Sequence, residues 1–284
     1  MASIACFYLR AERWVLSFFS HMRTWPAKCL GILQRLRNTD PGLFSIHQLT
    51  YLSNGKSAIV YEIDKTRVLK VFAVDANQAA MEHQAYKRIG SHPNIVNLLA
   101  TLKDGSIVLE RGDVLRTVCR FPSANKIPIR RKLHWLTQAA RGYQHLHDRN
   151  IIHADIGCNN MILTKEDDLK LIDFEGCSID GGPADACYEW FSYRPSEPQV
   201  SRKTDIFAFG CAIYEVMTGR QPYHELQESA PGTNQVQQLY ADNQFPDVTS
   251  IPLDEVILRC WLGEFDSMNE VIQGLEAFHP DAVT

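Results

Sequence analysis

Short apolar runs and one amphipathic run organise the first part of the chain. Four runs have strand length, at 49–52, 58–63, 68–72 and 106–112, and the amphipathic run at 76–89 has helix length. A turn that contains Gly55 separates the first two runs, which predicts a hairpin. The pattern therefore indicates a small region made mostly of strands, with one helix.

Longer periodic runs dominate the chain after residue 112. Apolar residues recur every three or four positions between 130 and 149, which predicts an amphipathic helix. Further helices are expected after Lys203, at 253–261 and at 267–278, with Gly219 as the stop of the first and Asp205 as its cap. The combination of a strand-rich region and a helical region predicts the α+β class.

Composition excludes several classes of protein. The chain has 284 residues, 45% of them hydrophobic and 22% charged, which is ordinary for a globular protein. A net charge of −4 does not favour a nucleic-acid binder. The eight cysteines form no C-x-x-C pair, so we expect reduced thiols and a cytoplasmic or nuclear protein. No apolar run reaches the roughly 18 residues that a transmembrane helix needs.

The segment 1–39 differs from the rest of the chain. It holds six basic residues and one acidic residue, together with many aromatic ones. A basic amphipathic leader of this kind is compatible with a transit peptide or a weak membrane-surface helix. We favour an N-terminal extension that packs on the domain or stays loose, because the acid and the Trp25-Pro26 break weaken the targeting pattern.

Three polar residues on short loops carry the candidate chemistry. Asn160 and Asp173 flank two apolar runs joined by the tight turn 164–168, so a hairpin would bring them together. A carboxylate and a carboxamide offer the hard oxygen ligands that Mg²⁺ prefers. Asp155, five residues before Asn160, is then available to accept a proton from a hydroxyl nucleophile. The alternative is two polar turns without chemistry.

Several motifs together resemble those of protein kinases of the serine/threonine type. They are His153-Ala154-Asp155 with Asn160, Asp173-Phe174-Glu175, the turn His92-Pro93-Asn94-Ile95-Val96, and Asp205 to Gly210 on a helix. The resemblance covers most of the chain. It implies a bilobal fold with an extension at 1–44, a strand-rich N-lobe with one helix at 45–111 and a helical C-lobe at 112–284.

The resemblance also implies a complete ATP and Mg²⁺ site. Asp173 and Asn160 would hold the metal, and Asp155 would take the proton of the acceptor hydroxyl on a protein substrate. Lys70, a lysine within an apolar strand that needs a partner, would be held by Glu82 and orient the phosphates. The remaining nucleotide contacts would come from the glycine loop and the backbone of the hinge: Ser53, Gly55, Ala58, Val60, Glu110 and Arg111.

Four departures from the family pattern qualify this function. Ala154 replaces an arginine that reads a loop phosphate, so we expect that phosphorylation of segment 176–196 is not the switch. Gly157 stands in place of a lysine, Glu175 replaces a glycine, and the glycine loop keeps only Gly55. We expect weak activity. A nucleotide-binding pseudokinase and a small-molecule phosphotransferase of the aminoglycoside or choline type remain as alternatives.

Overall fold

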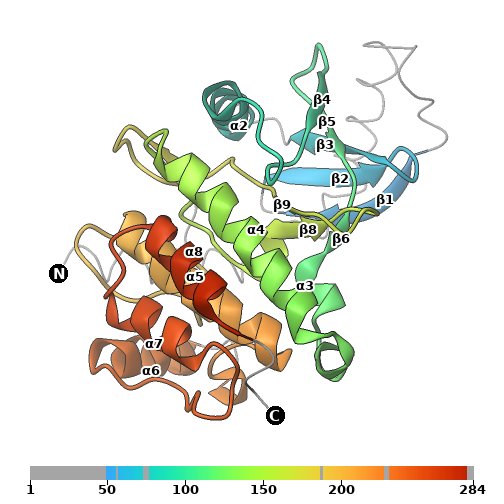
Figure 1. Cartoon of the computed structure of the whole chain (residues 1–284). Helices are drawn as coiled ribbons and strands as arrows, with labels where there is room; N and C mark the ends of the chain where they lie inside the picture. Colours follow the sequence, from blue (N-terminus) through green and yellow to red (C-terminus); the bar gives the residue numbers. More distant parts are fainter. Residues whose placement is uncertain (1–48, 56, 73–76, 186–187, 227–229, 280–284) are drawn as a thin grey trace. The chain divides into compact units, whose positions relative to one another are not determined.

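The computed structural model describes residues 49–279, apart from 56, 73–76, 186–187 and 227–229. The predicted extension 1–44, and any membrane contact of 1–39, lie outside the described residues. The chain divides into two compact units, one built on the sheet and one on the helices, which are described in turn (Figure 1). Strands and helices in these proportions confirm the α+β class. Within the described part, no helix is long and apolar enough to cross a bilayer.

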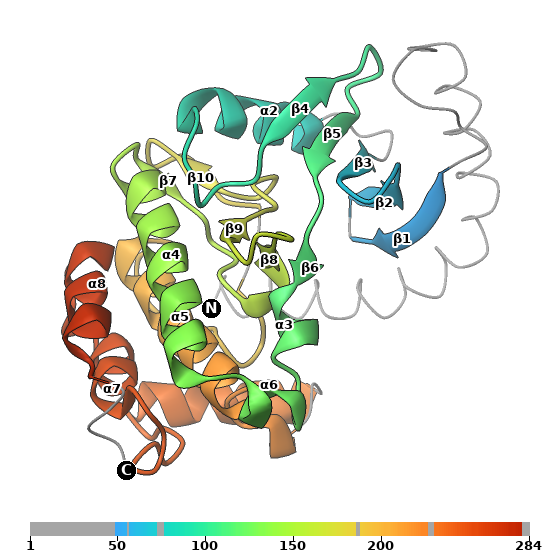
Figure 2. The same cartoon turned by 45° about the vertical axis from the view of Figure 1, so that its right-hand side comes forward.

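A five-stranded sheet forms the first unit, with the strand order β1-β2-β3-β5-β4 (Figure 2). The strands are β1 (Thr50–Asn54), β2 (Ala58–Glu62), β3 (Arg67–Phe72), β4 (Leu98–Thr101) and β5 (Ile107–Glu110). Alternate residues of the strands point to one face, where they build a core of Ile59, Tyr61, Leu69, Val71, Leu102 and Val108. The predicted hairpin and third strand are thus present.

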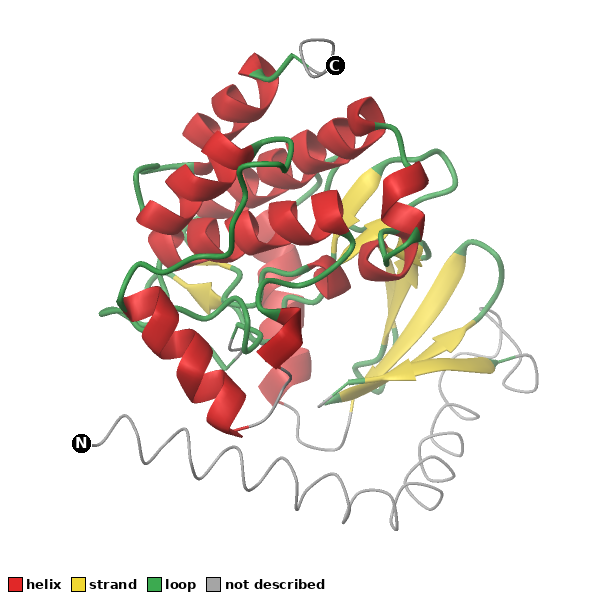
Figure 3. Ribbon diagram, turned by 90° about the horizontal axis from the view of Figure 1, so that it is seen from below, coloured by secondary structure: helices red, strands yellow, loops and turns green. Residues whose placement is uncertain are grey.

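Helices make up most of the second unit, shown in red in Figure 3. They are α2 (Asn77–Ile89), α3 (Leu115–Val118), α4 (Ile129–His147), α5 (Arg202–Thr218), α6 (Ala230–Ala241), α7 (Asp254–Leu262) and α8 (Met268–Ala277). Its short strands are β6 (Asp113–Val114), β7 (Ile151–Ile152), β8 (Met161–Leu163), β9 (Leu169–Leu171) and β10 (Ser178–Ile179). The described residues of this unit also form three single-turn 3₁₀ helices: η2 (Ser123–Lys126), η3 (Cys158–Asn160) and η4 (His224–Leu226).

Helix α5 lies in the core of this unit, because nearly all of its residues are buried. It packs on α7, where Gly210 allows close approach: a Cβ there would lie 2.7 Å from that of Cys260. Amphipathic α4 packs on α8 and on β9. The thiols of five cysteines are free and buried in the described part of the chain: Cys119, Cys158, Cys177, Cys211 and Cys260.

Helix α2 and the turn after it contact helix α4, the residue after β10 and strand β9 of the same unit. Arg88 forms a 2.7 Å ion pair with Asp180, and the ring of His145 bonds to the carbonyl of Ile89. The side chain of buried Asn94 donates to the carbonyl of Leu169 at 3.1 Å. The turn that contains Asn94 therefore connects α2 to the β8–β9 hairpin.

The ends of α5 correct one expectation and confirm another. Ser201, not Asp205, caps the helix: its hydroxyl accepts from the N–H of Thr204, and the Thr204 hydroxyl accepts from the N–H of Ser201. Asp205 lies in the first turn, where its carboxylate turns inward. Gly219 ends the helix at φ 75°, a conformation that favours glycine.

Replacing Ser201 with alanine is expected to lower the free energy of unfolding by about 1 kcal/mol, since one N–H of the first turn then loses its acceptor. Urea unfolding measures the change. Ser267→Ala is the matched control, because the cap of α8 has a longer hydrogen bond of 3.4 Å to the N–H of Glu270 and is expected to lose less. Equal midpoints for wild type and Ser201→Ala would contradict the capping role.

Candidate active site

The β8–β9 hairpin brings Asn160 to the same end as the loop that carries Asp173. Met161 pairs with Leu171 across the hairpin, so the residues just outside the pair meet at its end. The N–H of Ile172 donates to the carbonyl of Asn160 at 3.1 Å, which extends the pairing to the residue before Asp173. The hairpin register therefore places Asn160 and Asp173 at the same end of the hairpin.

Asn160 also fixes the position of Asp155. Its side-chain amide donates to the backbone carbonyl of Asp155 at 2.8 Å and to its carboxylate at 3.0 Å. With the amide nitrogen used in this way, the carboxamide oxygen is the atom left for a cation. The structure thus groups the three polar residues that the sequence singled out.

The carboxyl group of Asp155 holds its proton more tightly than an ordinary aspartate. Burial is the largest cause and, with the nearby charges of Glu189 and Asp173, it raises the pKa to about 7. The hydrogen bond from Asn160 and the charge of Arg116 oppose the shift. A carboxylate with a pKa near neutrality suits a general base that works near pH 7.

Asp205 braces the loop before Asp155. Its buried carboxylate accepts from the backbone N–H groups of His153 and Ala154, at 3.0 and 3.1 Å. It also bonds to the ring of His147 at 2.9 Å and accepts from the hydroxyl of Tyr188 at 2.7 Å. These contacts confirm the bracing role that the sequence suggested for Asp205, although that residue does not cap the helix.

Two residues of the site adopt the left-handed backbone region that side chains disfavour. Ala154 has φ 63° and Asp173 has φ 69°. Each such residue costs about 1–3 kcal/mol and persists only when its surroundings hold it. The carboxylate of Asp205 holds Ala154, and the bonding of Ile172 to Asn160 constrains the chain before Asp173. This strain at two adjacent loops is typical of a functional site.

Aromatic packing fixes the residue after Asp173. Phe174 is fully buried between the rings of Tyr86 and His153, at centroid distances of 5.3 and 5.6 Å. Burial lowers the pKa of His153, whose Nε2 atom bonds to the carbonyl of Ile172 at 3.1 Å and so carries the proton of the neutral ring. The packing ties the two loops of the site to α2.

Three carboxylates from α2 and the Asp173 loop lie together. One oxygen from each of Glu82, Asp173 and Glu175 falls within 4.8 Å of the others. Glu82 is fully buried. Clustered carboxylates need cations near them, and hard oxygen donors of this kind fit Mg²⁺. Glu175, which replaces the glycine of the family pattern, therefore adds an acid to the predicted metal site.

The predicted phosphate-contacting residues of the first unit lie on one hairpin and the strand beside it. The N–H of Gly55 donates to the carbonyl of Ala58 at 2.8 Å, which closes the turn after Ser53. Lys70 is buried on β3 directly opposite Val60 on β2, so their side chains share a face of the sheet. Lys70 and Glu82 belong to different units, and their pairing stays a prediction.

The predicted hinge residues follow β5. The N–H of Glu110 donates to the carbonyl of Asn97 at 3.1 Å, and its carboxylate pairs with Lys170 at 2.7 Å. The contacts of an adenine ring with the backbone of Glu110 and Arg111 stay a prediction.

A network around Arg116 belongs to the site, and sequence reasoning missed it. The guanidinium forms ion pairs with Glu189 and Glu215, at 2.6 and 2.5 Å. Gly157, two residues after Asp155, lies against the Glu189 carboxylate. Arg116 lies on a helix of only four residues and its partners are 73 and 99 positions away, so no local pattern indicated the contact.

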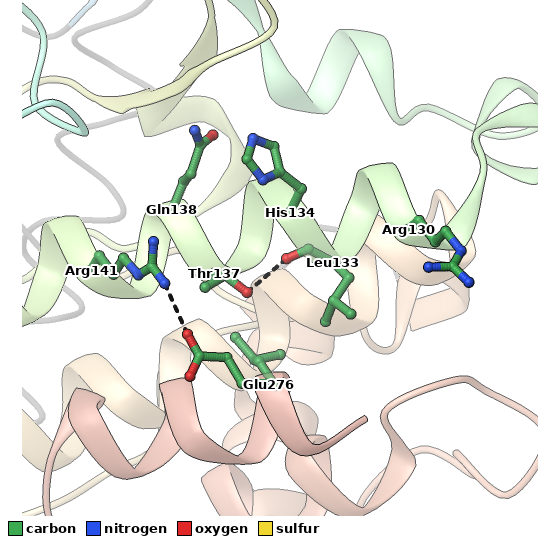
Figure 4. A pocket seen from close by; sticks show the side chains of 8 residues that line it. Arg130, Leu133, His134, Thr137, Gln138, Arg141 and Glu276 are labelled. Carbon is green, nitrogen blue, oxygen red and sulfur yellow. Dashed lines mark hydrogen bonds and ion pairs between the residues drawn. The ribbon is translucent and has the colours of Figure 1, made fainter. Parts of the chain in front are cut away.

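A separate hollow of roughly 300 Å³ lies between α4 and α8 (Figure 4). Its lining residues are Arg130, Leu133, His134, Thr137, Gln138, Arg141, Leu275 and Glu276. Arg141 and Glu276 form an ion pair of 2.9 Å across it. It contains none of the predicted catalytic residues, and we assign it no chemistry.

Comparison with known proteins identifies the family. The family described as "Protein kinase domain" matches residues 46–281. The chain is 28% identical to the epidermal growth factor receptor of Apis mellifera over 62% of its length, and 25% identical to tyrosine-protein kinase FRK of Homo sapiens over 70%. It is 31% identical to the probable serine/threonine-protein kinase samkA of Dictyostelium discoideum over 68%.

The chain spans 14%, 42% and 29% of the lengths of these three relatives, and two of their names give different acceptor residues, tyrosine and serine/threonine. The family match, in contrast, covers most of this chain and includes every residue of the candidate site. With Asp155, Asn160 and Asp173 assembled on two braced loops, the chain belongs to the protein kinase domain family.

Proposed function

We propose that this protein transfers the γ-phosphate of ATP to a serine or threonine hydroxyl of a protein substrate. The observation that carries the proposal is the grouping of Asp155, Asn160 and Asp173. The Asn160 amide donates to the carboxylate of Asp155, whose pKa is raised by burial to about 7, and a pKa near the working pH suits a base that accepts a hydroxyl proton.

The donor set of the site fits Mg²⁺. Asp173 and the carboxamide oxygen of Asn160 are hard ligands of the kind that this ion binds beside substrate phosphates. When bound, the ion would neutralise the charge that develops on the phosphates. The work of the protein is then to hold the acceptor hydroxyl against Asp155, to take its proton there and to orient the phosphates with Lys70.

Serine or threonine as the acceptor is supported by the Dictyostelium relative, whose name is that of a probable serine/threonine-protein kinase. The name of the human relative is that of a tyrosine-protein kinase, so the test of the acceptor also includes a tyrosine peptide. We propose the cytoplasm or the nucleus as the place of action, because reduced thiols persist there.

Radiolabelled ATP with Mg²⁺ tests the function, using matched peptides that present serine, threonine or tyrosine. We expect label in the serine or threonine peptides, its loss with EDTA, and a fall of about 100-fold or more in Asp173→Asn, since one metal ligand loses its charge. Asp185→Asn, on the same segment, is the matched control. Label in tyrosine alone would replace the proposed acceptor.

Two other outcomes would replace the function itself. If Mg-ATP raises the melting temperature but no peptide or protein is labelled, the chain is a nucleotide-binding scaffold. If label enters only an aminoglycoside or choline, the chain is a small-molecule phosphotransferase.

A further inference from the structure

Arg116 is held between one fixed and one replaceable carboxylate. Glu215, on the buried helix α5, has a side chain that is only 5% exposed and contacts the Nε and Nη2 atoms of Arg116. Glu189 contacts the other edge of the guanidinium through both carboxylate oxygens, at 2.7 and 2.6 Å, yet its side chain is 27% exposed. Glu189 lies on a segment without helix or strand, so it can leave at a lower cost than Glu215.

Gly157 makes room for the replaceable carboxylate. A Cβ atom at this position would lie 2.7 Å from Oε2 of Glu189, closer than such atoms approach one another, and 3.8 Å from Nη2 of Arg116. The side chain of Asn159 lies on the same carboxylate, with its Nδ2 atom 3.5 Å from Oε1. An anion therefore fits against the backbone that follows Asp155 because residue 157 has no side chain.

The network lies against the loop that carries the base. Gly157, the residue whose missing Cβ leaves room for Glu189 and Arg116, is only two positions after Asp155. The Arg116 pKa is itself raised: burial opposes the charged form, but hydrogen bonds and ion pairs with Glu189 and Glu215 outweigh burial. Arg116 is thus a permanent cation beside the loop that carries Asp155.

We propose that Arg116 recognises an acidic group of the substrate, a carboxylate or a phosphate beside the acceptor residue, and that Glu189 holds this place in the free enzyme. The inference rests on the proposed kinase function and names its substrate class. Exchange of Glu189 for a substrate anion keeps one cation between two anions, with Glu215 still in place. The planar fork of arginine fits both kinds of anion through paired hydrogen bonds.

Matched peptides test the inference. Each carries one serine acceptor and, at one position from three before to three after it, glutamine, glutamate or phosphoserine. We expect the best acidic peptide to exceed its glutamine counterpart about tenfold in kcat/KM, mostly through KM, because the contact forms on binding. Phosphoserine well above glutamate would identify phosphate as the anion, and similar values would identify a carboxylate. Either result supports the site.

Variants separate recognition from structure. Arg116→Gln alone leaves Glu215 buried without its cation, so the informative variant is Arg116→Gln with Glu215→Gln, in which both groups are neutral. This pair is expected to bring the acidic-to-neutral ratio close to one. Glu189→Gln, which removes the competing charge, is expected to raise the ratio threefold or more. Thermal unfolding verifies that each variant folds.

The two proposals fail in different ways. A wild-type preference for acidic peptides below twofold, or a preference that survives in the Arg116→Gln/Glu215→Gln variant, overturns the acidic site while leaving kinase activity intact. Absence of transfer to every peptide counts against the kinase function. In that case, fluorescence anisotropy of dye-labelled versions of the same peptides measures their affinity for the protein. Equal affinity for the glutamate and glutamine peptides overturns the proposal that Arg116 recognises an acidic group.

Discussion

Replacement of Asp155 with asparagine is expected to remove nearly all phosphoryl transfer and, above pH 7, to make the fold more stable. Transfer falls by about 10²–10⁴-fold because the amide cannot accept the proton of the acceptor. Stability rises because ionised Asp155 is partly buried near Glu189 and Asp173, an arrangement that raises its pKa to about 7. The isosteric amide removes that charge and keeps an oxygen for the Asn160 hydrogen bond.

The sign of the stability change depends on pH. A carboxyl group whose folded pKa exceeds its unfolded value loses stabilisation as the pH rises from about 4 to about 7. Wild type should therefore lose stability over this range relative to Asp155→Asn, by about 2–4 kcal/mol in total. Thermal unfolding at pH 5 and pH 8 measures it. Equal melting temperatures of the two proteins at pH 8 would show that the ionised carboxylate of Asp155 does not destabilise the fold.

Activity should follow the same ionisation. Because only the deprotonated carboxylate is a base, kcat/KM of the wild type is expected to rise about tenfold per pH unit below pH 7 and to level off above it. A flat profile from pH 5.5 to 8.5 would indicate that Asp155 is ionised throughout.

Replacement of Asp205 with alanine is expected to cost about 3–5 kcal/mol of unfolding free energy. The carboxylate is fully buried, and its loss leaves the N–H groups of His153 and Ala154 and the hydroxyl of Tyr188 without this acceptor. Ala154, at φ 63°, also loses the contact that holds its backbone. Phosphoryl transfer by Asp205→Ala should also fall, because the loop before Asp155 loses the hydrogen bonds that hold its backbone.

Urea unfolding of Asp205→Ala beside Asp242→Ala measures this effect. Asp242 is an exposed aspartate whose carboxylate accepts from the side-chain amide of Gln238, and its replacement is expected to cost less than about 1 kcal/mol. If Asp205→Ala does not fold, Asp205→Asn keeps one acceptor oxygen and should show a smaller loss. A midpoint for Asp205→Asn equal to that of wild type would contradict the bracing role.

Local patterns predicted most of the fold and the centre of the site. The helices expected at 130–149 and 253–261 are observed at Ile129–His147 and Asp254–Leu262, because their apolar spacing directly reflects the buried face. Asn160 and Asp173 lie at the same end of the hairpin because a tight turn fixes the register of the strands between them.

Interactions between distant segments were not predictable in the same way. The Arg116 network joins three segments with no shared pattern. The cap of α5 was misassigned because Ser201 and Asp205 are both good capping residues, and only the backbone path decides between them.

The reactivity of the five buried cysteines can be used to measure unfolding of the protein. Burial raises the pKa of each of these thiols, so reactive thiolate is scarce in the native state. A maleimide reagent should therefore modify Cys158, Cys211 and Cys260 only when the helical unit opens. Peptide-level mass spectrometry of the labelled protein would follow that opening residue by residue, without a dye or an engineered probe.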